Sequence, residues 1–329
     1  MAESFRAFVV NKTEDAFEAG VKELTRENLP DGEVLIRVVY SGLNYKDGLA
    51  STPNGQVVRK YPFVPGIDLA GRVVESTDKK FRENDEVIVT SYGLGVSHYG
   101  GFSEYARVPA AWVVPLPRSL SLREAMTLGT AGFTAALAIH KLEVNGLKPE
   151  NGPVLITGAT GGVGSHAISM LSNLGYTVAA STGKETEHDY LRGLGASEIL
   201  SREEVSAEGK PLDKERWAGS VDAVGGNTLA YLTRTTKYGG SIASIGNTGG
   251  PKFTATVFPF ILRGINLLGI DSVACPMDLR LNLWNRLAND LKPKNLAWTV
   301  EREIGLDDLP EATGQILAGK VRGRLLIKP

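Results

Sequence analysis

A glycine-rich run, Thr157 to Gly164, follows the apolar stretch Val154–Ile156 and precedes a helical pattern. Its glycines at 158, 161 and 164 have the spacing G-x-x-G-x-x-G, a variant of the G-x-G-x-x-G fingerprint of dinucleotide sites. Glycines in such a loop permit a tight turn and bring backbone N–H groups close to a pyrophosphate at a helix N-terminus. The pattern predicts a dinucleotide site held by backbone dipoles, because no Lys or Arg occurs from residue 151 to 183. A glycine turn without a ligand is the alternative.

The next informative polar residues come about 20 positions later, where a second predicted strand ends. Sites selective for NAD place an acidic residue there for the 2′-hydroxyl of the ribose. This chain instead has Ser181-Thr182-Gly183-Lys184, a hydroxyl followed by a cation, and Arg202 lies just past the third predicted strand. These two cations favour a 2′-phosphate, so the sequence predicts NADP(H) as the cofactor. Glu185 opposes this preference, and a solvated lysine on a surface loop is the alternative.

Metal ligands are scarce in this chain. A catalytic zinc site takes about three protein ligands, typically from Cys, His and acidic residues. The chain has one cysteine, Cys275, and four histidines that are not paired at ligand spacing: His98, His140, His166 and His188. Cys275 is predicted to be a small buried residue. We therefore expect an active site without a metal.

Hydride transfer without a metal needs an acceptor that is already electron-poor, such as a quinone, an enone or an α,β-unsaturated thioester. The protein then supplies a hydrogen-bond donor or a proton for the atom that gains charge. The polar run Asn44-Tyr45-Lys46-Asp47 is the best candidate, and Asn44 and Tyr45 are predicted to be catalytic. Tyr45 would donate a proton or contact the nicotinamide, and a turn tyrosine that packs on the barrel is the alternative. Asp68 is a second candidate, although such an acid more often caps backbone N–H groups.

The elements that must position these residues change in character along the chain. Short strands are predicted at 34–39, 71–75, 86–90, 103–108 and 112–117, which suggests a barrel or sandwich. Ser121 and Glu124 have the spacing of a capping box, before a helix predicted over 125–142. Apolar strands then alternate with helical segments, at 154–156, 178–180, 199–200, 221–224, 242–245 and 267–270. This alternation predicts a parallel, doubly wound α/β sheet, followed by a helix at 277–291 and a strand at 323–328.

The composition is that of a globular protein of about two domains. The 329 residues include 36 Lys and Arg and 37 Asp and Glu, a net charge of −1, so no nucleic-acid partner and no membrane partner are expected. The chain opens without a signal-peptide pattern and holds no apolar run long enough for a membrane span, so a cytoplasmic location is predicted. Glycine is abundant, at 38 residues with five Gly-Gly pairs. Four pairs, beginning at 161, 225, 239 and 249, are expected at strand ends that face one cleft.

Several runs of the sequence resemble the zinc-independent medium-chain dehydrogenase/reductase superfamily, and within it the acryloyl-CoA reductase and quinone oxidoreductase family. The matching runs are Ser41–Asp47, Pro65–Asp68, Gly129–Ala135, Thr157–Gly164, Thr256–Arg263, Gly269–Ser272 and Gly323–Arg324. The glycine loop is shared across the superfamily, whereas the other runs together are far more specific. The resemblance covers essentially the whole chain.

The resemblance implies an α/β fold: a Rossmann doubly wound parallel sheet plus a GroES-like β-barrel catalytic domain. Residues 1–125 and 300–329 would form the GroES-like catalytic domain, and residues 126–299 the Rossmann NADP-binding domain. It also implies NADPH, no zinc and a homodimer built on the last strand of the sheet. Carried over by position, the resemblance implies cofactor contacts at Tyr45, Thr160, Gly161, Gly162, Val163, Thr182, Gly183, Lys184, Arg202, Asn247, Ile261 and Ser272. Zinc-dependent relatives place Cys and His where this chain has Asn44 and Ile67.

The leading hypothesis is an NADPH-dependent reductase of an activated C=C bond, with an acryloyl-CoA-like thioester as small-molecule substrate. Quinone reduction with the same cofactor is the alternative. A non-catalytic NADPH-binding redox sensor is a third possibility, which the polar Asn44-Tyr45 pair argues against. A CoA substrate would need cations near its phosphates, and the sequence offers Arg59, Lys60, Arg263 and Arg324 for this role.

Overall fold

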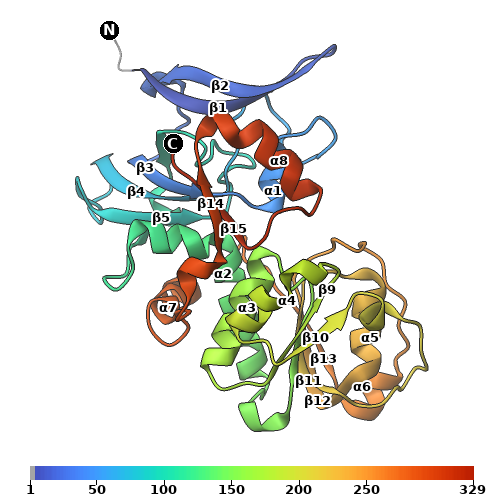
Figure 1. The fold of residues 1–329 in the computed structure, drawn as a ribbon. Helices are drawn as coiled ribbons and strands as arrows, with labels where there is room; N and C mark the ends of the chain where they lie inside the picture. The colour runs from blue at the N-terminus through green and yellow to red at the C-terminus, as the bar shows by residue number, and fades with distance from the viewer. Residues whose placement is uncertain (1–3) are drawn as a thin grey trace. The chain divides into compact units, whose positions relative to one another are not determined.

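The computed structural model describes residues 4–329, which form two compact units (Figure 1). The first unit contains the chain up to Thr130 together with Val273–Ala288 and Val300–Pro329. The second unit contains Ala131–Ser272 and Asn289–Thr299. Residues 273–288 therefore pack with the first unit, whereas the division expected from the sequence placed them with the nucleotide-binding domain.

The first unit is built mainly from antiparallel strands. β1 (Ser4–Lys12) and β2 (Phe17–Thr25) form a hairpin of their own. A seven-stranded sheet has the order β14-β15-β3-β4-β5-β7, and β6 pairs with β3. Its strands are β3 (Val34–Gly42), β4 (Asp68–Ser76), β5 (Glu86–Thr90), β6 (Tyr105–Val108), β7 (Val114–Pro115), β14 (Val300–Ile304) and β15 (Arg324–Ile327). The strands predicted at 34–39, 71–75, 86–90 and 103–108 are confirmed, whereas within 112–117 only Val114–Pro115 is a strand. The hairpin is an addition to them.

Helices of the first unit alternate with these strands along the chain. They are α1 (Tyr45–Ala50), α7 (Met277–Leu287), α8 (Leu309–Leu317) and the first turns of α2 (Leu122–Val144). The predicted capping box of α2 is confirmed, because the N–H of Ser121 donates to Glu124 at 2.9 Å and the N–H of Glu124 donates to Ser121 Oγ at 3.2 Å. Short 3₁₀ turns occupy Arg26–Asn28, Ala110–Trp112, Pro149–Asn151, Glu185–Glu187, Glu204–Ser206, Leu296–Thr299 and Leu306–Asp308.

Buried apolar side chains join the first unit's distant segments. Phe8 of β1, Phe63, Phe102 and Leu325 of β15 belong to one cluster in which each is at most 4% exposed. Burial of such a side chain contributes roughly 1.5–3 kcal/mol, so this cluster holds the end of the chain against its beginning. Strand β15 is thereby fixed beside β3, where Leu326 pairs with Gly42.

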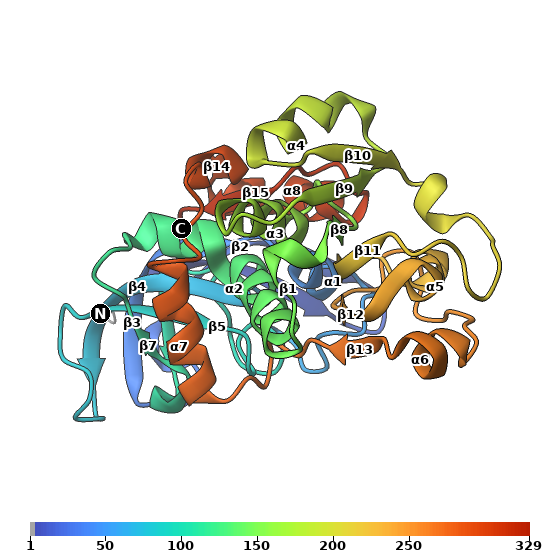
Figure 2. The ribbon, with the colours of Figure 1, turned by 90° about the horizontal axis from the view of Figure 1, so that it is seen from below.

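The second unit contains a six-stranded parallel sheet with the order β10-β9-β8-β11-β12-β13. Its strands are β8 (Val154–Ile156), β9 (Val178–Thr182), β10 (Glu198–Ser201), β11 (Trp217–Asp222), β12 (Thr236–Ser244) and β13 (Asn266–Gly269). Helices α3 (Gly162–Asn173) and α4 (His188–Leu194) cover one face, and α5 (Gly226–Thr235) and α6 (Phe258–Arg263) cover the other (Figures 1 and 2). Counted along the sheet the order is 3-2-1-4-5-6, so the predicted doubly wound fold is confirmed.

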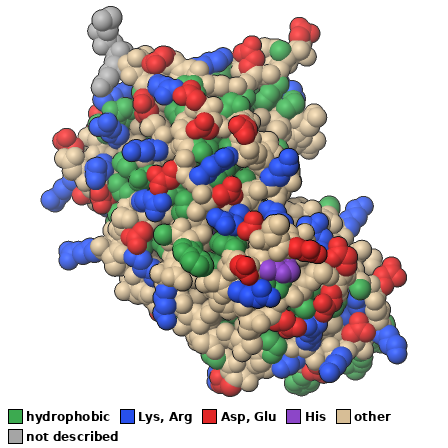
Figure 3. Space-filling view, in the orientation of Figure 1, with side chains coloured by type: hydrophobic (Ala, Val, Ile, Leu, Met, Phe, Trp, Pro, Cys, Tyr) green, Lys and Arg blue, Asp and Glu red, His purple; other side chains and the backbone are tan. Residues whose placement is uncertain are grey.

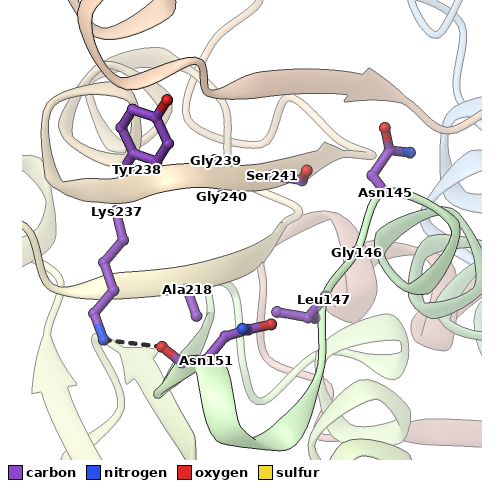
Figure 4. A pocket seen from close by; sticks show the side chains of 10 residues that line it. All are labelled: Asn145, Gly146, Leu147, Asn151, Ala218, Lys237, Tyr238, Gly239, Gly240 and Ser241. Atoms are coloured by element: carbon purple, nitrogen blue, oxygen red, sulfur yellow. Dashed lines mark hydrogen bonds between the residues drawn. The ribbon is translucent and has the colours of Figure 1, made fainter.

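Strand β12 contains a bulge at the amino edge of this sheet. Trp217 pairs with Thr236, but Gly219 pairs with Ser241, so residues 237–240 leave the ladder. They line a pocket of about 160 Å³ (Figure 4), where Lys237 Nζ donates to the carbonyl of Asn151 at 3.1 Å. The pair Gly239-Gly240 therefore lies at the edge opposite the phosphate loop, and the expectation that it faces the same cleft as the other glycine pairs is wrong.

Acidic and basic side chains are interspersed over the face in Figure 3, and neither sign forms a large separate patch there. Among the helices of residues 4–329, none has the length and apolar character needed to cross a bilayer.

Candidate active site and cofactor loops

The side-chain amide of Asn44, which directly precedes α1, is held at both ends by hydrogen bonds. Its Nδ2 donates to Asp68 Oδ2 at 2.9 Å and to the carbonyl of Gly42 at 3.2 Å. Its Oδ1 accepts from Nη1 of Arg324 at 2.8 Å. The backbone N–H of Asn44 donates to Oδ2 of Asp47 at 2.8 Å, which closes the first turn of α1. The amide therefore has one fixed orientation, and its donors and its oxygen are already engaged.

Asp68 and Arg324 form the buried ion pair to which Asn44 is bound. Nη2 of Arg324 lies 3.1 Å from Asp68 Oδ2, and the two side chains are 2% and 0% exposed. Arg324 also donates to the carbonyls of Leu43 at 3.0 Å and Met126 at 3.5 Å. A buried pair needs such additional hydrogen bonds to offset the desolvation of both charges. The network is therefore a rigid support and not an exposed anion site.

Thr130 completes the shell around Asp68, and a kink in α2 at Gly129 places it there. The N–H of Thr130 donates to Asp68 Oδ1 at 3.0 Å, and its hydroxyl donates to the same oxygen. Gly129 has φ +50° and ψ −155°, a conformation open essentially to glycine. A Cβ there would lie 2.5 Å from Asp68 Oδ2 and 2.6 Å from Nη2 of Arg324. Glycine at 129 thus lets the helix backbone approach the ion pair closely.

Asp47 is a second buried carboxyl group in this network. Burial, and after it the charge of Asp68, raises the pKa of Asp47 from 3.8 to about 7. Hydrogen bonds from the N–H of Ile67, at 2.8 Å, and from Asn44 act in the opposite direction. The first unit therefore contains a carboxyl group whose charge changes near neutral pH, next to the turn that carries Asn44 and Tyr45.

Tyr45, the first residue of α1, is accessible where its neighbours are not. Its side chain is 43% exposed, and within residues 4–329 its phenol donates no hydrogen bond to the protein. Tyr45 is thus the member of the predicted catalytic pair that retains a free donor, while Asn44 has used its own.

The phosphate loop of the second unit has the geometry that its glycines predict. Gly158 follows β8 with φ +58°, and Gly161 is the N-cap of α3 without a side-chain hydrogen bond. A Cβ on Gly164 would lie 2.6 Å from the carbonyl oxygen of Gly158. The first turn of α3 therefore packs directly on the loop, and its N–H groups form a cradle suited to a pyrophosphate. Thr160 precedes this turn and Val163 belongs to it, so the predicted contacts from 160 to 163 lie together.

The two predicted cations lie at adjacent strand ends. Thr182 ends β9, and its Oγ1 accepts from the N–H of Lys184 at 3.0 Å. Arg202 directly follows β10, whose last residue, Ser201, pairs with Thr182. The guanidinium of Arg202 covers Gly183 so closely that a Cβ there would lie 3.1 Å from it. Thr182, Gly183, Lys184 and Arg202 therefore form one group with the donors that a 2′-phosphate requires.

Glycine pairs at the same carboxyl edge pack backbone against backbone. A Cβ on Gly225 would lie 2.7 Å from the carbonyl oxygen of Gly250, and one on Gly226 would lie 2.6 Å from that of Gly249. Asp222, whose pKa is raised by burial, accepts from the N–H of Gly225 at 3.0 Å and from Thr157 Oγ1 at 2.5 Å. These contacts fix the loops that follow β8, β11 and β12, and they account for two glycine pairs without a ligand.

The three remaining predicted cofactor contacts lie in different places. Asn247 is exposed in the loop after β12. Ser272 is buried after β13, and its Oγ accepts from Thr134 Oγ1 at 2.9 Å. Ile261 is 68% exposed on α6, which Arg263 ties to the carbonyl of Thr236 at the start of β12. The second unit thus groups Asn247 with the loops at the carboxyl edge and places Ile261 on a separate helix.

Family models and known proteins match this architecture. The model for the alcohol dehydrogenase GroES-like domain matches residues 30–118, and that for zinc-binding dehydrogenases matches residues 162–289. "Putative quinone oxidoreductase YhfP" of Bacillus subtilis is 55% identical and covers 100% of both chains. "Acrylyl-CoA reductase AcuI" of Ruegeria pomeroyi is 51% identical over 98% of each chain. The chain belongs to the medium-chain dehydrogenase/reductase family.

Solved structures of this family agree with the chain over nearly its full length. The yhdH oxidoreductase of Salmonella enterica in complex with NADP has a TM-score of 0.96 at 45% identity, covering 98% of this chain and 99% of that one. YhfP of B. subtilis with NAD bound has a TM-score of 0.98 at 55% identity, with 100% of each chain covered. The predicted family, fold and oxidoreductase class are confirmed.

The second family model is described as a zinc-binding dehydrogenase, and the residues of this medium-chain reductase differ from that description. Within the part of the chain that the structure describes, no three His, Cys, Asp or Glu side chains gather as a metal site. The candidate positions carry Asn44, whose amide binds Asp68 and Arg324, and Ile67, whose N–H binds Asp47. At these two positions, the side chain of Asn44 and the backbone N–H of Ile67 therefore form hydrogen bonds within the chain.

Sequence reasoning missed the partners of Asn44. Arg324 was expected to be available to a CoA phosphate, but it is 2% exposed and bound to Asp68. Arg263 was expected there too, but Nη1 donates to the carbonyl of Arg234 at 2.6 Å. A polar residue at the start of the apolar run Arg324–Ile327 was the available signal, because an arginine in a buried strand requires a partner. Arg59 and Lys60 are exposed, so they remain the candidates for binding a CoA phosphate.

Proposed function

We propose that the chain is an NADPH-dependent reductase of activated C=C bonds, with an acryloyl-CoA-like α,β-unsaturated thioester as substrate. The observation that carries the choice of NADPH is the guanidinium of Arg202 against Gly183, at the strand end where the N–H of Lys184 binds Thr182, because it places a cation where a 2′-phosphate would lie. The 51% identical relative named acrylyl-CoA reductase supports the choice of substrate class. Quinone reduction is kept as a second candidate because the 55% identical relative is named for it.

The second unit's residues fit NADPH at three points. Backbone N–H groups of Gly161, Gly162 and Val163, with Thr160 beside them, would hold the pyrophosphate at the N-terminus of α3. Thr182, Gly183, Lys184 and Arg202 would hold the 2′-phosphate, and Asn247, Ile261 and Ser272 are the further contacts proposed by family resemblance. Bound NADPH supplies a hydride to the β-carbon of the unsaturated thioester. Equal binding of NADH would contradict this assignment, since NADH lacks the phosphate.

In the first unit, Tyr45 and Asn44 take different roles. The exposed phenol of Tyr45 is proposed to contact the nicotinamide or to donate a hydrogen bond or proton where charge develops on the substrate. Asn44 is proposed to position Tyr45, because its fully bonded amide fixes the start of α1 against Asp68 and Arg324. Removal of the Tyr45 phenol would therefore lower kcat while the fold stays intact.

Assembly and location are further parts of the proposal. β13 ends the order of the six-stranded sheet, and among residues 4–329 it pairs with β12 alone. Leu262 on α6 and Leu267 on β13 are 57% and 38% exposed. Pairing of two β13 strands in a homodimer would satisfy the open strand edge and cover apolar surface. A cytoplasmic location accords with a reductase that uses the cellular NADPH pool.

Steady-state kinetics test the substrate assignment. Initial rates of NADPH oxidation are measured with acryloyl-CoA and with 1,4-benzoquinone, with NADH in place of NADPH as the matched control. We expect saturation with acryloyl-CoA, formation of propionyl-CoA, and a higher kcat/KM with NADPH than with NADH. Turnover of quinones alone would reject the thioester and favour the second candidate.

A further inference from the structure

Two consecutive residues after β5 adopt left-handed backbone conformations although neither is glycine. Ser91 has φ +67° and Tyr92 has φ +52°. A left-handed residue that is not glycine costs on the order of 1–3 kcal/mol, whereas glycine adopts such angles without that strain. Ser91 is 3% exposed, so its side chain faces the interior of the first unit. Glycine would form this turn without strain, so the presence of Ser91 and Tyr92 indicates that their side chains have a role that offsets the strain.

Arg280 of α7 clamps this turn from one side. The arginine is fully buried, and its Nη1 donates to Oγ1 of Thr90 at 2.9 Å and to the carbonyl of Thr90 at 3.1 Å. Its Nε donates to the hydroxyl of Tyr92 at 3.2 Å, and its guanidinium lies 4.3 Å from the centre of the Tyr92 ring. One guanidinium therefore fixes the residues before and after Ser91. Lysine could not reproduce this planar, multidentate arrangement.

Further contacts hold Tyr92 in the same position. Its hydroxyl donates to the carbonyl of Cys275 at 3.0 Å, and its N–H donates to that of Val273 at 3.3 Å. The ring stacks on Trp112 with centroids 5.9 Å apart and an interplanar angle of 11°. The turn is thus fixed by several independent contacts, which is the condition under which strained backbone persists.

The clamped turn directs Ser91 into the network around Asp68. The N–H of Ser91 donates to the carbonyl of Ile67, the residue before Asp68, at 2.9 Å. Its Oγ lies 3.3 Å from the hydroxyl of Thr130, which itself donates to Asp68. Asp68 in turn accepts from the amide of Asn44. Two hydrogen bonds therefore connect Ser91 to the carboxylate that orients Asn44.

We propose that Ser91 and Arg280 are positioning residues for the reduction. Ser91 holds the hydroxyl of Thr130 on Asp68, and Arg280 holds Ser91 by clamping Thr90 and Tyr92. This inference rests on the proposed function of the Asn44-Tyr45 turn. It explains why a turn that glycine would form without strain carries serine.

Ser91→Gly and Ser91→Ala separate the hydroxyl from the backbone strain. Ser91→Gly removes the hydroxyl and relieves the strain, so the Tm should stay unchanged or rise. Ser91→Ala removes the hydroxyl and keeps the strain. We expect both variants to lose about 10-fold in kcat, with the KM for NADPH unchanged, because one hydrogen bond of the network is lost. A structural role alone would lower the Tm of both variants and leave kcat intact.

Arg280→Met tests the clamp, with Arg192→Met, the same substitution at an exposed position of α4, as the control. Arg280→Met should lower kcat to the level of Ser91→Gly, and Arg280→Lys should not restore it. In the double variant with Ser91→Gly, kcat should fall little further, because the hydroxyl that Arg280 positions is already absent. Multiplicative losses in the double variant would reject the link between Arg280 and Ser91.

The comparison uses acryloyl-CoA and 1,4-benzoquinone in parallel. Wild-type kcat in Ser91→Gly with the acceptor that turns over would overturn the positioning inference and leave the proposed function standing. A wild-type enzyme active on quinone alone would reject the thioester, while a reduced kcat of Ser91→Gly on quinone would still support the inference. Failure of wild type with both acceptors overturns both.

Discussion

Replacing Arg324 by methionine leaves the carboxylate of Asp68 buried without the guanidinium that pairs with it. Asp68 is 0% exposed, and the two charged groups lie 3.1 Å apart. The substitution also removes the donors to the carbonyl of Leu43 and to Oδ1 of Asn44. Methionine has a similar length and fills much of the same space, so lost charge and hydrogen bonds dominate the effect.

The expected magnitude follows from burial. Removing one partner of a buried pair costs about 3–5 kcal/mol, because an uncompensated charge stays inside the protein. An exposed pair in the same sheet gives the comparison: Arg72 and Glu86 lie 2.9 Å apart with side chains 54% and 40% exposed. Such a pair contributes about 0–1 kcal/mol. Arg324→Met should therefore destabilise the first unit several times more than Arg72→Met.

Urea unfolding followed by circular dichroism measures both variants, and steady-state kinetics measures the effect on the site. The double variant Arg324→Met/Asp68→Asn removes the orphaned charge, and we expect it to regain about 1–3 kcal/mol through the coupling of the pair. We also expect kcat to fall in Arg324→Met, because Asn44 loses the donor to its Oδ1. A stability loss no larger than that of Arg72→Met would refute the assignment of a buried, structurally essential pair.

Three further predictions concern the cofactor loops and the pH dependence. Arg202→Ala should weaken the binding of NADPH about 10-fold or more and leave the binding of NADH nearly unchanged, as measured by fluorescence titration. Equal losses of affinity for both cofactors would contradict the contact with the 2′-phosphate. Gly164→Ala places a Cβ 2.6 Å from the carbonyl of Gly158 and should weaken the binding of both cofactors, whereas Gly314→Ala on α8, where a Cβ meets nothing within 4 Å, should not, by the same titration. The folded-state pKa of Asp47, about 7, lies above its ordinary 3.8, so its contribution to stability is fully present below 3.8 and is lost as pH rises to 7. The stability of Asp47→Asn relative to wild type should therefore rise by about 2 kcal/mol from pH 5 to 7 in denaturant titrations, and a constant difference would reject the raised pKa.

Local patterns in the sequence were sufficient for much of the fold. The capping box at Ser121 and Glu124 predicts the start of α2, and its hydrogen bonds are present. The hairpin of β1 and β2 was missed because its turn, near Thr13 and Ala16, contains no glycine or proline. The strained turn at Ser91 was missed for a related reason, since its conformation is imposed by tertiary contacts from Arg280.

The candidate site was predictable only where neighbouring residues form it. The run Asn44-Tyr45-Lys46-Asp47 contains its own hydrogen bond, from the N–H of Asn44 to Asp47 three residues later. Arg324 joins this group through the pairing of β15 with β3, and no local pattern reports such pairing. The expected cation for a phosphate therefore proved to be a buried partner of Asp68.

The distance between Asp68 and Arg324 along the chain has a consequence for synthesis in the cell. The two residues are 256 positions apart, and ribosomes add roughly 5–20 residues per second. Asp68 therefore leaves the ribosome roughly 13–50 s before its partner. The long continuous part of the second unit, 131–272, is made within that interval and can begin to fold, while the first unit waits for β15 with an unpaired carboxylate and an open sheet edge. Chaperone dependence during translation should therefore be concentrated in the first unit.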